Sequence, residues 1–359
     1  LFGASVGREG TAVQIGGSIA DFFGRLFGLN EKDSRTVLIA GVAAGFGAVF
    51  GTPLAGTIFA IEVLTVGRLQ YDAIIPCLIA TILADQTVAL WGIHHTVYHI
   101  DAFVTKPPFA LSFIHFDYFL LGKIIIASVL FGLTSYVFAE MAHGVKNVSL
   151  RLIKTTWLIP VTGGLIIIGL TFLLGKQDYL SLGVDAQFPN SVTVPSAFHQ
   201  GGADTWSWLW KTIYTTITLG TGFKGGEVTP LFYIGATLGN TLSQLLNAPV
   251  GLFAALGFIA VFAGATNTPL ACTFMGIELF GGEYAVYFAV ACFTAYFFSG
   301  HSGIYSSQRI AIPKIFDPDH GAETSIGESI NRRRRLMNYR LARYGRKIKQ
   351  KIGHCIFLG

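Results

Sequence analysis

The 359 residues of the chain are 52% hydrophobic and only 13% charged, and they include 43 glycines, which excludes an ordinary soluble domain and favours a polytopic membrane protein. The formal net charge of +5 comes from one segment, because residues 332–351 hold ten Lys and Arg and no acid, leaving 15 basic and 20 acidic residues elsewhere. Such a tail favours a cytoplasmic end facing anionic membrane lipid over an arm that binds nucleic acid.

Apolar windows near the length of a membrane span recur along the chain. In chain order they are residues 35–66, 73–92, 117–139, 157–175, 208–222, 228–246, 250–280 and 284–299. Gly or Pro interrupts several of them, and interrupted helices occur at membrane depth only where protein or a polar cavity surrounds them. We therefore expect an all-α polytopic membrane protein with broken and tilted helices. Because the chain begins with Leu1 directly before a motif, we also expect further helices to precede it.

Four segments form two matching pairs across the chain: 52–62 with 268–278, and 7–17 with 225–235. The first pair is identical at seven of eleven positions with an offset of 216, and the second, looser pair has an offset of 218. Two matches in the same order at nearly the same offset predict two halves related by a pseudo-two-fold axis, with a site at their interface. The second pair aligns Glu9 with Glu227, so the repeat predicts that both face one central site.

The first of these glutamates lies in a glycine-rich motif before an apolar helix. Glycines let the backbone approach an ion closely, and the free N–H groups of a helix start attract anions. We therefore predict an anion site formed around Gly7, Arg8 and Gly10, although Arg8 could instead pair with a carboxylate. Glu9 would occupy this site when ionised and leave it when protonated, which makes it a gate and a proton carrier. The alternative is that Glu9 only caps its helix.

The second half repeats this design before another helix, which has Pro230 in its first turn. Here the candidates for anion binding are the amides around Gly226 and Val228 and the hydroxyl of Thr229, with Glu227 beside them. The alternative is a glycine-rich turn between packed helices.

Two signatures of other functions are weak. Residues 3–7 fit G-x-S-x-G around Ser5, but no strand precedes them to hold a nucleophile elbow. His94, His95 and His99 cluster in a polar stretch, yet no carboxylate stands at metalloprotease spacing. We therefore expect neither an enzyme nor a metal or other cofactor.

Together, the motifs resemble the CLC chloride-channel family. The likeness rests on GREG before a helix, GG-x-x-x-P opening a second helix, the repeated TPLA segments and a tyrosine after residues 300–304, and it covers nearly the whole chain. It implies the CLC inverted-repeat fold in a homodimer with one pathway in each subunit. It also implies that Glu9 is the external gating glutamate, that the amides around Glu227 and Val228 line a central anion site, and that Tyr305 supplies its hydroxyl.

The resemblance divides the chain into three parts: the remainder of the first repeat and following helices (1–175), the second repeat (176–310) and a basic cytoplasmic tail (311–359). Dimer contacts would come from helices near 73–91 and 284–298. The expected location is the inner membrane of a bacterial cell, with the carboxyl terminus in the cytoplasm.

Three departures from the chloride-transporting pattern are similar to the fluoride-exporting bacterial branch of the family. Thr11 replaces the usual proline after GREG, and residues 226–230 replace G-x-F-x-P. The internal proton glutamate of chloride/proton exchangers would fall at Val63; the GIYSSQ stretch at 303–308 also fits the fluoride branch. We therefore expect a fluoride/proton antiporter, with a chloride channel or chloride/proton exchanger of the same family as the alternative.

Glu227 is the natural substitute for the missing proton glutamate. An ionised carboxylate would repel every halide, whereas a protonated one donates a hydrogen bond, and fluoride is the strongest acceptor among the halides. The alternative is that Glu227 pairs with Lys224 or Arg8 and only holds its loop.

Overall fold

The computed structural model describes residues 3–96, 98, 100, 117–186, 188, 191–314, 324–330 and 332. These residues form a helical protein, and the predicted all-α class is confirmed. The helices are α1 (Glu9–Leu26), α2 (Glu31–Phe50), α3 (Pro53–Glu62), α4 (Ile74–Leu90), α5 (Tyr118–Leu152), α6 (Leu158–Leu174), α7 (Ser207–Gly220), α8 (Val228–Leu246), α9 (Val250–Thr266), α10 (Pro269–Phe280) and α11 (Ala285–Phe298). Short 3₁₀ turns occur at η1 (Tyr71–Ala73), η2 (Ser196–Phe198) and η3 (Gly282–Tyr284).

Two of the predicted apolar windows each contain two helices. Window 35–66 is divided after α2 and window 250–280 after α9, at equivalent positions of the repeat. Gly51 (φ 65°) and Asn267 (φ 61°) adopt the left-handed conformation that ends a helix, and a proline then opens the next helix at its first position. The window 117–139 was too short, because α5 continues to Leu152 through a more polar stretch.

Among the described residues, the segments long and apolar enough to cross a membrane are Glu31–Phe50, Tyr71–Leu90 and Tyr118–Leu152. Shorter apolar helices include α3, α6, α9 and α10. This mixture of long and short helices agrees with the expected broken helices.

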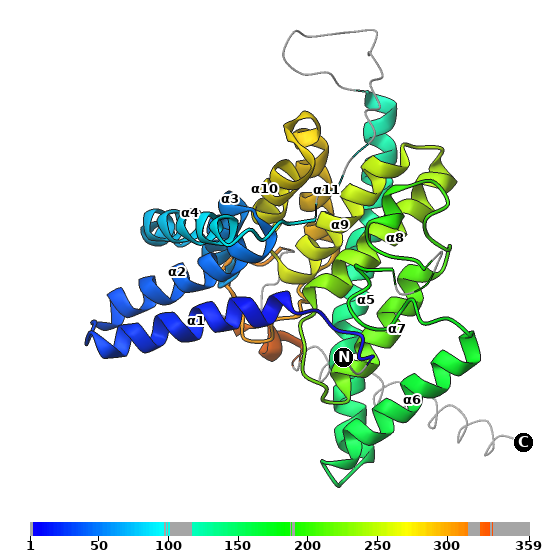
Figure 1. Cartoon of the computed structure of the whole chain (residues 1–359), viewed down its shortest axis with the longest axis horizontal. Helices are drawn as coiled ribbons and strands as arrows, with labels where there is room; N and C mark the ends of the chain where they lie inside the picture. Colours follow the sequence, from blue (N-terminus) through cyan, green and yellow to red (C-terminus); the bar gives the residue numbers. More distant parts are fainter. Residues whose placement is uncertain are drawn as a thin grey trace, which may run out of the picture.

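Helix α9 forms the centre of the core. It is buried from Leu252 to Thr266 and packs against α5, α8, α10 and α11, while α1, α2 and α4 lie side by side away from it (Figure 1). A Cβ atom at Gly235 would lie 2.1 Å from the carbonyl oxygen of Gly257, so the backbones of α8 and α9 are in direct contact. Gly16 and Gly41 make a similar approach between α1 and α2.

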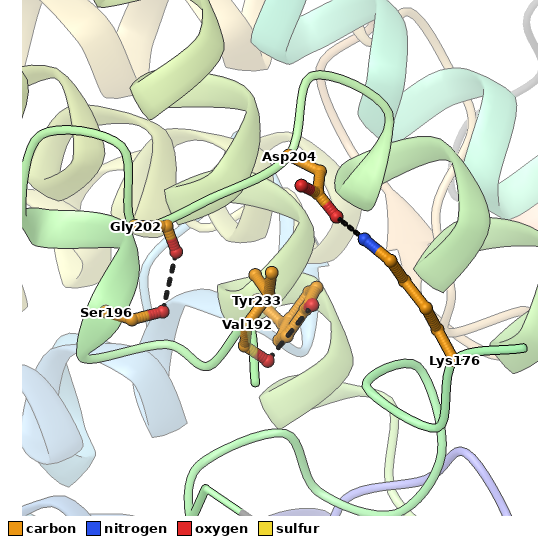
Figure 2. A network of polar contacts seen from close by, with 6 residues as sticks. All are labelled: Lys176, Val192, Ser196, Gly202, Asp204 and Tyr233. Carbon is orange, nitrogen blue, oxygen red and sulfur yellow. Dashed lines mark hydrogen bonds and ion pairs between the residues drawn. The ribbon is translucent and has the colours of Figure 1, made fainter. Parts of the chain in front are cut away.

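The segment between α6 and α7 is attached to α7 and α8 by polar contacts. Figure 2 shows the contact with α8, in which the Tyr233 hydroxyl donates to the Val192 carbonyl (3.3 Å). It also shows two contacts within the segment, the Lys176–Asp204 ion pair and the Ser196 hydroxyl donating to the Gly202 carbonyl (2.7 Å). The fully buried Lys211 ammonium of α7 also donates to the carbonyls of Tyr179 (3.2 Å) and Ser181 (2.8 Å). A buried ammonium requires such acceptors, so the segment and α7 stabilise each other.

The two TPLA helices cap each other. The carboxylates accept backbone N–H groups as follows: Glu62 from Leu270 (3.1 Å) and Ala271 (2.8 Å), and Glu278 from Leu54 (2.9 Å) and Ala55 (2.8 Å). The N-cap threonines of α3 and α10 make no side-chain cap. The glutamate at the end of each helix therefore satisfies the free donors at the start of the other.

A small sheet connects the end of α3 to the carboxyl-terminal part of the described chain. Strand β2 (Arg309–Ile310) pairs in parallel with β1 (Thr65–Val66) and antiparallel with β3 (Thr324–Ser325). Val66, Ile310 and Ile326 form its apolar contact. The predicted basic tail lies outside the described residues from 333 onward.

Candidate functional site

The two glycine-rich motifs meet through their backbones. Gly7 N–H donates to the Gly226 carbonyl (2.6 Å), and Gly226 N–H donates to the Gly7 carbonyl (2.7 Å). A Cβ atom at residue 7 would lie 2.5 Å from the Thr229 hydroxyl oxygen, and one at residue 226 would lie 3.1 Å from the Gly10 nitrogen. Glycine is therefore required for this approach, which places the amino-terminal ends of α1 and α8 next to each other.

Glu9 is buried at the first position of α1, and its carboxylate joins the two helix starts. Its Oε2 atom accepts a hydrogen bond from the Arg8 backbone N–H (2.9 Å) and another from the Thr229 hydroxyl. The Arg8 Nε atom lies 3.9 Å from Glu9 Oε1, but the Arg8 side chain is 81% exposed. The solvated Arg8 side chain is thus only a weak partner of the Glu9 carboxylate. The side chain that contacts Glu9 directly is Thr229.

A cavity of about 850 Å³ lies beside this junction and brings most of the predicted site residues together. Those that line it are Glu9, Gly10, Gly226, Glu227, Val228 and Tyr305. Phe46, Phe50 and Phe59 provide an apolar wall. Gly7, Arg8 and Thr229 do not line the cavity but support it through the contacts of Glu9 and the backbone bridge.

The two glutamates lie in the same cavity but at different helix positions. Glu9 is the first residue of α1, whereas Glu227 is the N-cap residue of α8. The sequence alignment that paired them is therefore displaced by one residue at the helix starts. Within the described part of the chain, the structure shows no hydrogen bond or ion pair between the Glu227 carboxylate and Lys224 or Arg8, and Arg8 lies near Glu9 instead. The role of Glu227 stays a prediction.

Lys146 and Lys224 also line this cavity, and the sequence interpretation overlooked Lys146. Lys146 lies on α5, where a Cβ atom on Gly220 would be 3.1 Å from its backbone nitrogen. This close packing brings α5 to the start of the loop that carries Glu227. Lys146 lies in the polar end of α5, beyond the apolar window, where the local sequence gives no sign that it faces a cavity.

The segment after α11 covers another side of the cavity, and here Gln308 was also overlooked. Ile304 N–H donates to the Ala265 carbonyl (3.0 Å), and the buried Gln308 side chain donates to the carbonyls of Val63 (2.7 Å) and Thr266 (3.0 Å). Val63 itself lines the cavity, at the position where the resemblance implied a missing glutamate. The segment thereby brings Tyr305 to the cavity that Glu9 and Glu227 also line.

The two weak alternatives gain no support. The Ser5 hydroxyl, buried in the structure, contacts the Thr215 hydroxyl (3.0 Å), which is not a general base. The described residues contain no group of three or more His, Cys, Asp and Glu side chains arranged to hold a metal ion. Of the histidine cluster, His99 lies outside the described residues.

Two glycine-bordered helix starts facing one cavity match a known membrane family. The family model described as "Voltage gated chloride channel" covers residues 1–300. The chain belongs to this family. It is therefore an integral membrane protein of the CLC type, and the resemblance drawn from its motifs is confirmed.

Individual CLC proteins are similar to the chain over most of its length. A chloride/fluoride channel protein of Pseudomonas syringae pv. tomato is 47% identical over 320 residues, covering 89% of the chain and 68% of the relative. The H(+)/Cl(-) exchange transporter ClcA of Vibrio cholerae is 26% identical over 293 residues, covering 77% of the chain. The chain spans only 58% of the length of that exchanger.

Solved CLC structures share the fold. A CLC-type fluoride/proton antiporter superposes with a TM-score of 0.77 at 35% identity, covering 86% of the chain and 74% of that structure. A slow cyanobacterial Cl⁻/H⁺ antiporter superposes with a TM-score of 0.64 at 21% identity, covering 83% of the chain and 69% of that structure. The predicted CLC fold is confirmed.

Proposed function

We propose that the chain is part of a transporter that exports fluoride in exchange for protons through the cavity between α1 and α8. The observation that carries this proposal is that two glutamates, Glu9 and Glu227, line one cavity where two helix starts meet. The similarity to a chloride/fluoride channel protein and to a fluoride/proton antiporter supports fluoride as the substrate.

Glu9 would couple the two ions by competing with the anion. Its carboxylate is held by a backbone N–H and a hydroxyl, donors that a halide could use equally well. Protonation removes the negative charge and weakens both hydrogen bonds, so the side chain leaves and the anion enters. One proton is then carried for each exchange of carboxylate and anion at this position.

Glu227 would favour fluoride over larger halides. Its side chain lines the cavity without a partner, so in the protonated form its hydroxyl is free to donate to an anion. Fluoride gains most from a short O–H contact because it is the smallest and most strongly accepting halide. This gain offsets part of its larger dehydration cost.

We further propose a homodimer in a bacterial inner membrane, with the carboxyl terminus in the cytoplasm. Ile75 and Leu83 on α4 and Phe293 and Phe297 on α11 present large apolar side chains outward, which suits contacts with a second copy. Cross-linking at low detergent should give a dimer, and only monomer would contradict it.

A reporter fused after Gly359 should be active inside the cell, whereas periplasmic activity would reverse the topology.

The transport proposal is tested by ion efflux from liposomes that contain the full-length parent protein. Fluoride efflux should exceed chloride efflux and should drive proton uptake. Preferred chloride efflux would instead identify a chloride channel or exchanger, and the presence or absence of proton uptake would distinguish these two.

A further inference from the structure

We propose that Gln308 is a specificity-determining residue of the anion pathway, because its side-chain amide covers the free carbonyl ends of two helices beside the cavity. The inference deepens the proposed function and rests on the cavity being an anion pathway. It assigns Gln308 a role in the passage of the anion, beyond holding the chain in place.

The carbonyl groups involved belong to helix ends. Val63 is the C-cap residue of α3, and Thr266 is the last residue of α9. The last carbonyls of a helix lack partners within the helix and carry the negative end of its dipole. Gln308 Nε2 lies 2.7 Å from the Val63 oxygen and 3.0 Å from the Thr266 oxygen, so its two hydrogens serve both helices at once.

The position of this contact matters because Val63 and Gln308 line the same cavity as Glu9 and Glu227. A bare carbonyl oxygen at the cavity edge would repel an anion and attract a cation. With the amide in place, the two oxygens are engaged in hydrogen bonds. The negative end of α3 at the cavity and the buried negative end of α9 are thereby masked near the path on which the positive ends of α1 and α8 attract the anion.

A second amide fixes the direction of the first. Asn267, the left-handed C-cap of α9, donates from Nδ2 to Gln308 Oε1 over 2.9 Å. An amide can otherwise present either its oxygen or its nitrogen to a neighbour. Because Asn267 donates to the oxygen, the NH₂ group of Gln308 faces the carbonyls.

The fold of this segment does not depend on the Gln308 side chain alone. Ile304 N–H donates to Ala265 O (3.0 Å), the His143 ring contacts Gly303 O (3.1 Å), and β2 pairs with β1. The position of Tyr305 is therefore held independently. Removing the Gln308 amide should uncover the carbonyls while most of the wall stays in place.

The test compares Gln308→Met with Gln308→Glu in the full-length protein in liposomes. Met keeps the length but donates nothing, so fluoride efflux should fall about tenfold or more, the order expected when buried acceptors lose their donor. Glu keeps the shape but presents oxygen to oxygen, so efflux should fall further, most of all at high pH. Ser306→Ala is the matched control, because Ser306 lies on the same segment, is exposed and does not line the cavity, and its efflux should stay within about twofold of the parent.

Thermal melting in detergent and the ratio of fluoride to chloride efflux separate this role from a purely structural one. A structural role alone would lower the melting temperature and leave the rate and ion ratio of the folded protein unchanged. Unchanged efflux in either folded variant would overturn the inference, and Gln308→Glu provides the test if the Met variant does not fold. If the parent carries chloride instead of fluoride, the proposed function fails, yet chloride efflux in the Gln308 variants still tests the masking of the carbonyls.

Discussion

The protein contains two pairs of repeat-related helix starts, and they use their free donors in opposite ways. In α3 and α10, each start is permanently filled by the glutamate from the end of the other helix, with all four N–H···O distances between 2.8 and 3.1 Å. In α1 and α8, only Glu9 is held, by one amide and one hydroxyl, while the Glu227 carboxylate has no hydrogen-bond partner in the described chain. Helix starts whose backbone N–H groups are all capped thus stabilise the packing of the two helices. Helix starts with N–H groups left uncapped can bind an ion.

The largest expected effect is at the pair formed by α1 and α8. Glu9→Gln removes the ionisable group but keeps its size, so proton transport should be abolished, because an amide cannot alternate between charged and neutral forms. Proton uptake driven by a fluoride gradient in liposomes measures this. Glu62→Gln serves as the control and should keep proton uptake, since Glu62 only caps a helix. Surviving uptake in Glu9→Gln would remove Glu9 from the coupling mechanism.

Glu227→Gln should have the next largest effect. The amide can donate a hydrogen bond but cannot release a proton, so coupling should weaken and fluoride-over-chloride selectivity should fall by about tenfold, equivalent to about one lost charge-assisted hydrogen bond. Competitive efflux of the two halides provides the measurement. Lys224→Met is the matched control from the same cavity wall. Selectivity and coupling equal to those of the parent would show that Glu227 acts only as a loop residue.

The pair formed by α3 and α10 should respond in stability and not in transport. In Glu278→Gln the amide nitrogen would face one of the two backbone donors, so one hydrogen bond is lost and the charge assistance of the other disappears. We expect a loss of about 1–3 kcal/mol in the free energy of unfolding. Denaturation in detergent monitors it, with transport measured in parallel. A variant of parental stability would mean that these caps contribute nothing.

The smallest effect is expected far from both pairs, at the ion pair between Lys176 and Asp204, whose side chains are each 50% exposed. Lys176→Met should change the free energy of unfolding by less than about 1 kcal/mol, because water and salt screen exposed ion pairs. The same denaturation experiment provides the value. A loss as large as that of Glu278→Gln would contradict the distinction between helix caps and exposed ion pairs.

Features that depend on a few neighbouring residues within each repeat could be predicted from the sequence. Gly and Pro within the apolar windows predicted broken helices, and the repeated glycine motifs predicted that Glu9 and Glu227 face one site. Both glutamates do line one cavity. The roles of these glutamates stay predictions. The TPLA segments were recognised as a repeat, but the mutual capping was not, because it depends on how α3 and α10 pack against each other.

Lys146 and Gln308 were missed for a related reason. Lys146 lies in the polar end of α5, and Gln308 in the GIYSSQ stretch that entered only through the family resemblance. Their contacts join residues that are far apart in the chain, such as Gln308 and Val63. Hydropathy and motif spacing describe neighbours in sequence and contain no information about such contacts.

The bridge between Gly7 and Gly226 consists of main-chain atoms alone. A substitution elsewhere in the cavity can alter charge, size or hydrogen bonding without breaking this connection between the two repeats. Substitutions in the cavity can therefore change the ion preference one residue at a time, while the backbone hydrogen bonds keep the two repeats aligned. A methyl group added at residue 7 would instead meet the Thr229 hydroxyl and the Glu9 carboxylate, so substitutions at the bridge itself act directly on the site.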